Sequence, residues 1–133
     1  SNNIQRIINL FARNVKRNFD FINSRGKEMA NDLGWSSFIQ RRDYLMASLM
    51  YKCINGKAPY YLSDNLHFTY EISKQSTRST TQNKLYVPSI KSEYLRKSFI
   101  YKGPVLWNNL PEFIRNAPDV FTFKKYYKET YFK

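Results

Sequence analysis

Cysteine, histidine and glycine are scarce in this chain of 133 residues, and each shortage excludes a class of site. The single cysteine, Cys53, cannot form an internal disulfide and favours a reducing compartment. Together with the single histidine, His67, it falls short of a structural zinc site, which needs about four ligands. Only four glycines are present, without a phosphate-binding loop, and no nucleophile elbow accompanies the histidine. We therefore expect no metal and no cofactor.

Acidic residues are also few, and their spacing argues against catalysis. Ten Asp and Glu face 22 Lys and Arg, and no two acids are adjacent. A polymerase needs clustered carboxylates to hold two divalent metals. The pair Pro118-Asp119 could open a nuclease site, but Glu129 is followed by Thr130 rather than by the required x-Lys. The sequence therefore predicts that the chain is not an enzyme.

Long apolar runs are missing as well. None approaches the roughly 20 residues of a membrane span, and no secretory signal opens the chain. We expect an intracellular protein, nuclear or cytoplasmic or both, that has no membrane partner. Binding of the first basic amphipathic helix to a membrane surface stays open as a weaker alternative.

Basic and aromatic residues are abundant instead. The net charge of +12 attracts polyanions in a salt-sensitive way, and nucleic acid is the favoured partner. Hydrophobic residues make up 42% and aromatic residues 17% of the chain, enough for a modest core. We predict a single domain over residues 1–133. Its class is mainly α, with five to six helices, a long basic loop and at most a short β-hairpin.

Periodicity and capping signals predict the first two helices. The segment around Ile4, Ile7, Ile8, Phe11 and Val15 has one apolar and one basic face; the apolar face suits a core and the basic face suits phosphates, and both remain open. A helix over 25–33 would be capped by Asn23 or Ser24 and stopped by Gly34, with Trp35 on the core.

The clearest helix is predicted over 38–55. Ser37 and Gln40 form a capping box, Gly56 ends the helix, and the buried stripe would be Leu45, Met46, Leu49, Met50, Cys53 and Ile54. Arg41 and Arg42 occupy its first turn, where the helix dipole disfavours cations. A bound phosphate would explain them.

The second half is irregular and basic. A helical turn is predicted over 58–62, and a polar loop over 67–88 would contain a short strand at 85–87. The best nucleic-acid surface lies between Glu71 and Lys102, where seven cations face two acids: Lys74, Arg78, Lys84, Lys91, Arg96, Lys97 and Lys102 against Glu71 and Glu93. Tyr94 and Tyr101 could stack on bases or fill the core.

Two further helices are predicted near the end of the chain. Pro104 would begin one of them, and Asn108 would hydrogen-bond backbone to lock the turn at Leu110-Pro111. Asp119 would cap the last helix, which carries Lys124, Lys125 and Lys128 outward. Phe99, Trp107 and Phe123 are expected in the core.

An ordered set of short motifs covers most of the chain. It comprises Leu33-Gly34-Trp35, Arg41-Arg42, Tyr51-Lys52-x-x-Asn55-Gly56-x-Ala58-Pro59-x-Tyr61-Leu62, Thr77-Arg78-Ser79, Leu85-Tyr86-Val87-Pro88, Lys97-Ser98-Phe99, Trp107-Asn108-Asn109-Leu110-Pro111 and Phe123-Lys124-Lys125. In this order the motifs resemble the thumb-like, post-polymerase region of LINE-type (non-LTR) retrotransposon reverse transcriptases, especially Jockey-like ones. The absence of a zinc knuckle fits a Jockey-like ending.

The resemblance implies a fragment of a larger polyprotein whose parent is an RNA-directed DNA polymerase. Its role would be to grip template RNA, an RNA–DNA hybrid or DNA through backbone phosphates, beside the remainder of the reverse transcriptase. The expected contact residues are Arg13, Lys16, Arg17, Arg41, Arg42, Lys74, Arg78, Lys91, Tyr94, Arg96, Lys97, Tyr101, Lys102, Lys124 and Lys125. The alternative is a structural or protein-interaction module that packs on the polymerase core or was recruited by a host.

Overall fold

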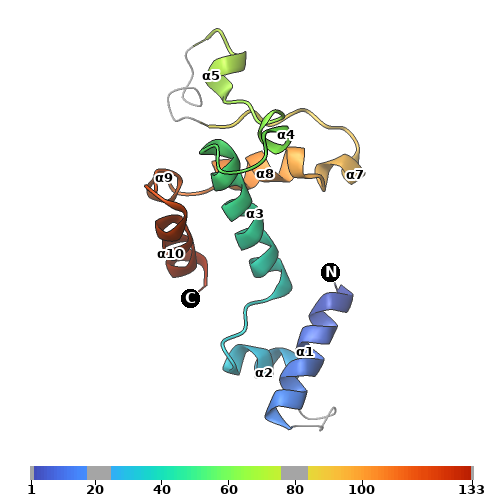
Figure 1. The fold of residues 1–133 in the computed structure, drawn as a ribbon. Helices are drawn as coiled ribbons and strands as arrows, with labels where there is room; N and C mark the ends of the chain where they lie inside the picture. The colour runs from blue at the N-terminus through green and yellow to red at the C-terminus, as the bar shows by residue number, and fades with distance from the viewer. Residues whose placement is uncertain (1, 18–24, 76–83, 133) are drawn as a thin grey trace. The chain divides into compact units, whose positions relative to one another are not determined.

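A computed structural model describes residues 2–17, 25–75 and 84–132, and helices dominate them (Figure 1). The helices are α1 (Asn2–Lys16), α2 (Gly26–Asp32), α3 (Phe38–Ile54), α4 (Tyr60–Ser63), α5 (Thr69–Ile72), α7 (Glu93–Arg96), α8 (Phe99–Asn108), α9 (Glu112–Arg115) and α10 (Val120–Tyr131). Among these residues the only β pairing is one antiparallel bridge, Phe68 with Leu85. The mainly α prediction is confirmed. The helices outnumber the predicted five to six because four of them are single turns of four residues.

The contacts divide the chain into two compact units, residues 1–43 and residues 44–131. Helix α3 begins in the first unit and continues into the second. The expectation of one domain over 1–133 remains a prediction.

In the first unit, α1 packs on α2 through small residues. Ala12, Met29 and Ala30 are buried, and Leu33 packs against them. A Cβ added to Gly26 would lie 2.9 Å from Asn9 Cβ, so glycine allows the two helices to approach closely. Most of the apolar stripe of α1 lies on another face and is exposed, with relative exposures of 45–60% at Ile4, Ile7, Phe11 and Val15, while Ile8 is half-buried. The possibility that this stripe fills a core is therefore wrong for the first unit.

Both ends of α2 can be compared with the prediction. Its N-cap is Arg25, whose side chain makes no capping bond, while the predicted caps lie outside the described residues. Gly34 stops the helix as predicted, at φ 70°. The Gly34 and Trp35 amides donate to the carbonyls of Asn31 and Ala30, both at 2.9 Å, which is a Schellman motif. The side chain of Trp35 is still 38% exposed, so its predicted burial is wrong.

Helix α3 has the predicted ends. The Ser37 amide donates to Gln40 Oε1 at 3.0 Å, and the Gln40 amide donates to Ser37 Oγ at 3.2 Å, which completes the capping box. Gly56 takes φ 67° after the last turn, and the Lys57 amide donates to the Lys52 carbonyl at 2.8 Å. These local signals were predictable because they depend on neighbours in the sequence.

The buried face of α3 is rotated from the predicted stripe. Met50 and Cys53 of that stripe are buried as predicted, but Ala47 and Tyr51 are buried beside them, whereas Leu45 is 55% exposed. The other stripe residues, Met46, Leu49 and Ile54, are half-buried. The reason is tertiary: the Tyr51 ring packs at a tilt against Phe123 of α10 with ring centroids 4.7 Å apart, and Met50 lies against Gly103 of α8. Trp107 and Tyr127 complete this aromatic core of the second unit.

Between α3 and α7 the chain forms more helix than predicted. The single turn α4 is confirmed over 60–63. The loop predicted over 67–88 contains α5, where the Phe68 amide donates to the Glu71 carboxylate at 3.2 Å. The strand predicted at 85–87 is wrong, since only Leu85 forms a bridge.

Helix α8 does not begin at Pro104. It begins at Phe99 after Ser98, and Pro104 lies inside it at the cost of one backbone hydrogen bond. Gly103 and Pro104 are buried, and a Cβ at Gly103 would lie 2.6 Å from Met50 Sδ. The dipeptide therefore fits a close crossing of α8 over α3, which a local reading cannot detect (Figure 1). Phe99 was predicted in the core but is only half-buried.

Asn108 binds backbone as predicted, but at a different segment. Its Oδ1 accepts from the Leu85 amide at 2.9 Å, and its Nδ2 donates to the Leu85 carbonyl at 2.8 Å. Leu85 is only 2% exposed, and among the described residues its one β pairing is the bridge to Phe68. The side-chain amide of Asn108 thus acts as a β-strand partner for Leu85.

Candidate nucleic-acid interface

Some predicted contact cations already have partners within the protein. Lys16 Nζ lies 2.8 Å from Asp32 Oδ2. The Arg42 guanidinium donates to Asp43 Oδ1 through Nε at 3.1 Å and Nη2 at 2.9 Å. Asp43 therefore supplies the negative charge for which the sequence suggested a phosphate. Arg41 is exposed on the same turn.

The remaining predicted contact cations of the first unit, Arg13 and Arg17, lie at the end of α1. Arg13 is half-buried over α2, where a Cβ at Gly26 would lie 3.1 Å from its Nε. Arg17 is exposed and takes a left-handed φ of 51° directly after the helix. Helix α1 therefore uses part of its basic face to hold α2.

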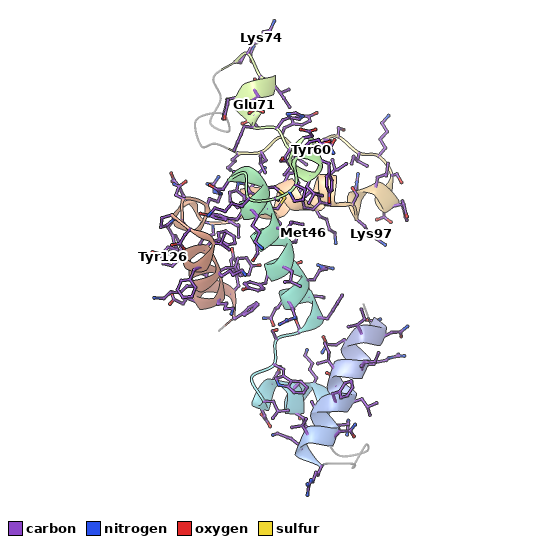
Figure 2. All side chains as sticks on the ribbon, in the orientation of Figure 1. Met46, Tyr60, Glu71, Lys74, Lys97 and Tyr126 are labelled. Atoms are coloured by element: carbon purple, nitrogen blue, oxygen red, sulfur yellow. The ribbon has the colours of Figure 1, made fainter. Side chains whose placement is uncertain are left out.

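The predicted cations of the second unit are spread over several elements. Lys74 is exposed after α5, and Arg78 lies outside the described residues. On α10, Lys124 is half-buried and Lys125 is exposed. Figure 2 shows Lys97 and Tyr126 of α10 on opposite sides of α3, so α10 and the Lys97 region do not form one surface.

One short stretch, residues 91–102, does bring several predicted contacts together, and we call it the α7 segment. It holds four cations and one carboxylate, a net charge of +3. Lys91, Tyr94, Arg96 and Lys97 are exposed, whereas Tyr101 and Lys102 are half-buried. Tyr94 has 83% of its surface exposed. Tyr94 therefore does not fill the core, which was one of its two expected roles.

Local geometry orders this segment. Ser92 is the N-cap of α7, and the Arg96 amide donates to its carbonyl at 3.2 Å. The Arg96 side chain turns back, and its Nε donates to the Ile90 carbonyl at 3.1 Å. This bond uses one of the five N–H groups of the guanidinium and leaves those on Nη1 and Nη2 for other acceptors. Lys97, three residues after Tyr94, shares its face of the turn.

Sequence reasoning missed two exposed aromatic residues and one cation–π contact. Tyr60 is 76% exposed, and Phe121 is 79% exposed on α10. Lys128 Nζ lies 5.4 Å from the Tyr44 ring centroid. No signal in the sequence could have separated these exposed rings from core rings, because both occur among apolar neighbours.

No three His, Cys, Asp or Glu side chains gather as metal ligands within 2–17, 25–75 and 84–132. Asp119 caps α10, with Oδ1 accepting from the Thr122 amide at 2.6 Å, and this bond is the main reason that its pKa is lowered. Burial raises the pKa of the Cys53 thiol, so it is a poor nucleophile. Among the helices of the described ranges, none is long and apolar enough to cross a membrane.

Comparison with protein families, with curated proteins and with solved structures gives no match for this chain.

Proposed function

We propose that this chain is a non-catalytic nucleic-acid-binding domain of a LINE-type retrotransposon reverse transcriptase, which grips template RNA or an RNA–DNA hybrid through its backbone phosphates. The retrotransposon assignment is supported by the ordered motifs of the sequence. The binding role is supported by one structural observation, the exposed cations Lys91, Arg96 and Lys97 of the α7 segment. The proposal places the protein inside the cell, in the nucleus, the cytoplasm or both.

The chemistry of the α7 segment suits phosphate rather than base edges. A lysine ammonium is a mobile point charge that reaches phosphate oxygens from many directions. The Arg96 guanidinium donates to Ile90 through Nε, and its outer N–H groups form a planar fork that suits two phosphate oxygens. Such contacts hold a strand without selecting its sequence.

Fluorescence anisotropy across a salt series tests the proposal. The ligands are single-stranded RNA, an RNA–DNA hybrid and duplex DNA of equal length. Single-strand affinity should fall with salt at a log–log slope of about −0.7 per phosphate contact. Changing Lys91, Arg96 and Lys97 to Ala should make that slope shallower by about 2. A matched variant changes Arg6, Lys27 and Lys57, three exposed cations outside the α7 segment, to Ala. Its salt slope should stay close to that of the wild type.

If both variants make the slope shallower by the same amount, the proposed location of binding in the α7 segment is contradicted. Binding no stronger than that of a generic polycation would contradict nucleic-acid binding as a function.

The second candidate is a structural or protein-interaction module that packs on the rest of the parent enzyme. The exposed apolar stripe of α1, with Phe11 at 60%, favours it. Under this alternative, Phe11→Asp should abolish pull-down of the polymerase core, while nucleic-acid affinity should stay unchanged. If Phe11→Asp changes neither the pull-down nor the nucleic-acid affinity, this alternative is contradicted.

A further inference from the structure

Tyr94 is an aromatic residue that folding leaves in water. Its exposure of 83% exceeds that of Phe121 at 79% and Tyr60 at 76%. Two other exposed rings contact an aromatic neighbour: Tyr70 stacks on Phe68 with centroids 5.2 Å apart, and Tyr60 meets Tyr61 edge-on at 6.3 Å. One face of the Tyr94 ring or both can therefore receive another flat group.

Three cations, Lys91, Arg96 and Lys97, and one carboxylate, Glu93, lie within three residues of this ring in the sequence. Lys91 lies three residues before Tyr94 and Lys97 three residues after it. Arg96 lies two residues after Tyr94, and its side chain donates to the Ile90 carbonyl. Side chains three residues apart on a helical turn are neighbours, so Lys97 and Tyr94 are presented together. A flat ring beside several cations matches one chemical class: a base attached to a phosphodiester backbone.

We propose that Tyr94 is a stacking platform for an unpaired base, so that the α7 segment binds single-stranded nucleic acid in preference to a duplex. The inference rests on the proposed nucleic-acid-binding function and names its preferred ligand. In a duplex, each base stacks on its neighbours and offers no free face inside the helix. In a single strand one base stacks on Tyr94, while Lys97 and Arg96 take the adjoining phosphates. Stacking tolerates any base and does not involve the 2′-hydroxyl, so RNA and DNA single strands bind alike through this residue.

Helix α10 carries a ring of comparable exposure, Phe121. Phe121 precedes Lys124 and Lys125 at helical spacing. Its surroundings are less basic, since Asp119 and Glu129 partly offset Lys124, Lys125 and Lys128 and leave a net charge of +1 over residues 119–129. The α7 segment carries +3, and it also has the hydrogen-bonded Arg96. Phe121 is thus the natural control.

The test measures affinities of the full 133-residue chain for a labelled single-stranded RNA, the matching DNA strand and a blunt duplex at one fixed salt concentration. Tyr94→Ser should weaken binding of both single strands by about 5- to 100-fold, the range expected for one stacked base. Duplex affinity should change by less than about twofold. Tyr94→Phe should keep wild-type affinities because phenylalanine also stacks. Phe121→Ser should change little, and helical circular dichroism shows that each variant folds.

The outcomes separate the two proposals. Absence of salt-dependent binding by the wild-type chain would overturn the proposed function and the stacking inference together. Salt-dependent wild-type binding that Tyr94→Ser leaves unchanged, or weakens equally for single strands and duplex, would overturn the stacking inference alone. A loss seen with Phe121→Ser instead would move the platform to α10 and also overturn it.

Discussion

Asn108 shows how one side chain can replace a missing β-strand. Its amide exchanges two hydrogen bonds with the backbone of Leu85, at 2.9 and 2.8 Å. Leu85 is almost fully buried, so its N–H and C=O have no ready access to water. The sequence suggested a backbone role for Asn108 but not its partner, which lies 23 residues earlier.

The first prediction concerns this pair. Asn108→Ala leaves two buried backbone groups without partners, and each such group costs about 1–3 kcal/mol. We expect the free energy of unfolding to fall by about 2–4 kcal/mol in urea titration. The adjacent Asn109 is exposed, and Asn109→Ala is the matched control, expected within about 0.5 kcal/mol of wild type. Equal effects of the two substitutions would contradict the role of Asn108.

Tyr51 offers a second prediction, which involves pH. Its hydroxyl donates to the Ala117 carbonyl, and burial, with a smaller effect of Asp119, raises the pKa of Tyr51. Tyr51→Phe removes the bond and should lower the free energy of unfolding by about 1 kcal/mol at neutral pH.

The sign of the pH effect follows from the direction of this shift. A phenol with a raised folded pKa contributes its stability fully below its unfolded pKa of about 10 and loses it as pH rises through the higher folded value. The stability gap between wild type and Tyr51→Phe should therefore shrink above about pH 10. A gap that widens with pH would contradict the direction of the shift.

Among the elements, those with local signals were predictable and those set by tertiary contacts were not. Ser37, Gln40 and Gly56 define α3 through neighbours within a few residues. The start of α8 was misplaced because proline usually begins a helix, whereas Pro104 lies inside one that crosses α3 closely. Likewise, the buried face of α3 depends on α8 and α10, and no periodicity in α3 reveals them.

The third prediction tests the crossing of α8 over α3. Gly103→Ala gains up to about 1 kcal/mol of helix propensity but drives a methyl group toward the buried Met50 sulfur, and overpacking costs about 1–3 kcal/mol. We expect a net loss of stability. Met50→Ala alone should also destabilise, by leaving a cavity. The double variant should lose less stability than the two single variants lose in sum, because the new methyl group enters the space that Met50 leaves. Simple additivity would contradict direct contact.

The fourth prediction concerns the electrostatics of the α7 segment. Glu93 is its only carboxylate, adjacent to Tyr94 and four residues before Lys97. Glu93→Gln removes repulsion of phosphates at an exposed site, where such charges interact by well under about 1 kcal/mol. Single-strand affinity in low salt should rise about two- to threefold, and physiological salt should reduce the gain. Weaker binding by this variant would argue against phosphates beside α7.

For the whole molecule, the sequence predicts a polyanion as the partner and the stretch between Glu71 and Lys102 as its place of contact, but not which cations are free. A net charge of +12 indicates a polyanion, yet it does not show which cations are free. Lys16 and Arg42 belong to ion pairs with Asp32 and Asp43, and only folding makes this visible. The exposure of Tyr94 was equally hidden, since an aromatic residue between basic and apolar neighbours fits either core or surface.

The most direct test of the central claim is a crosslinking map. Single-stranded RNA that contains photoreactive uridine is crosslinked to the full chain, and the labelled peptides are identified by mass spectrometry. The account predicts that crosslinks concentrate in residues 91–102 and disappear as salt is raised. Crosslinks that gather instead on α1 or α10, or that spread evenly over all basic peptides, would contradict it.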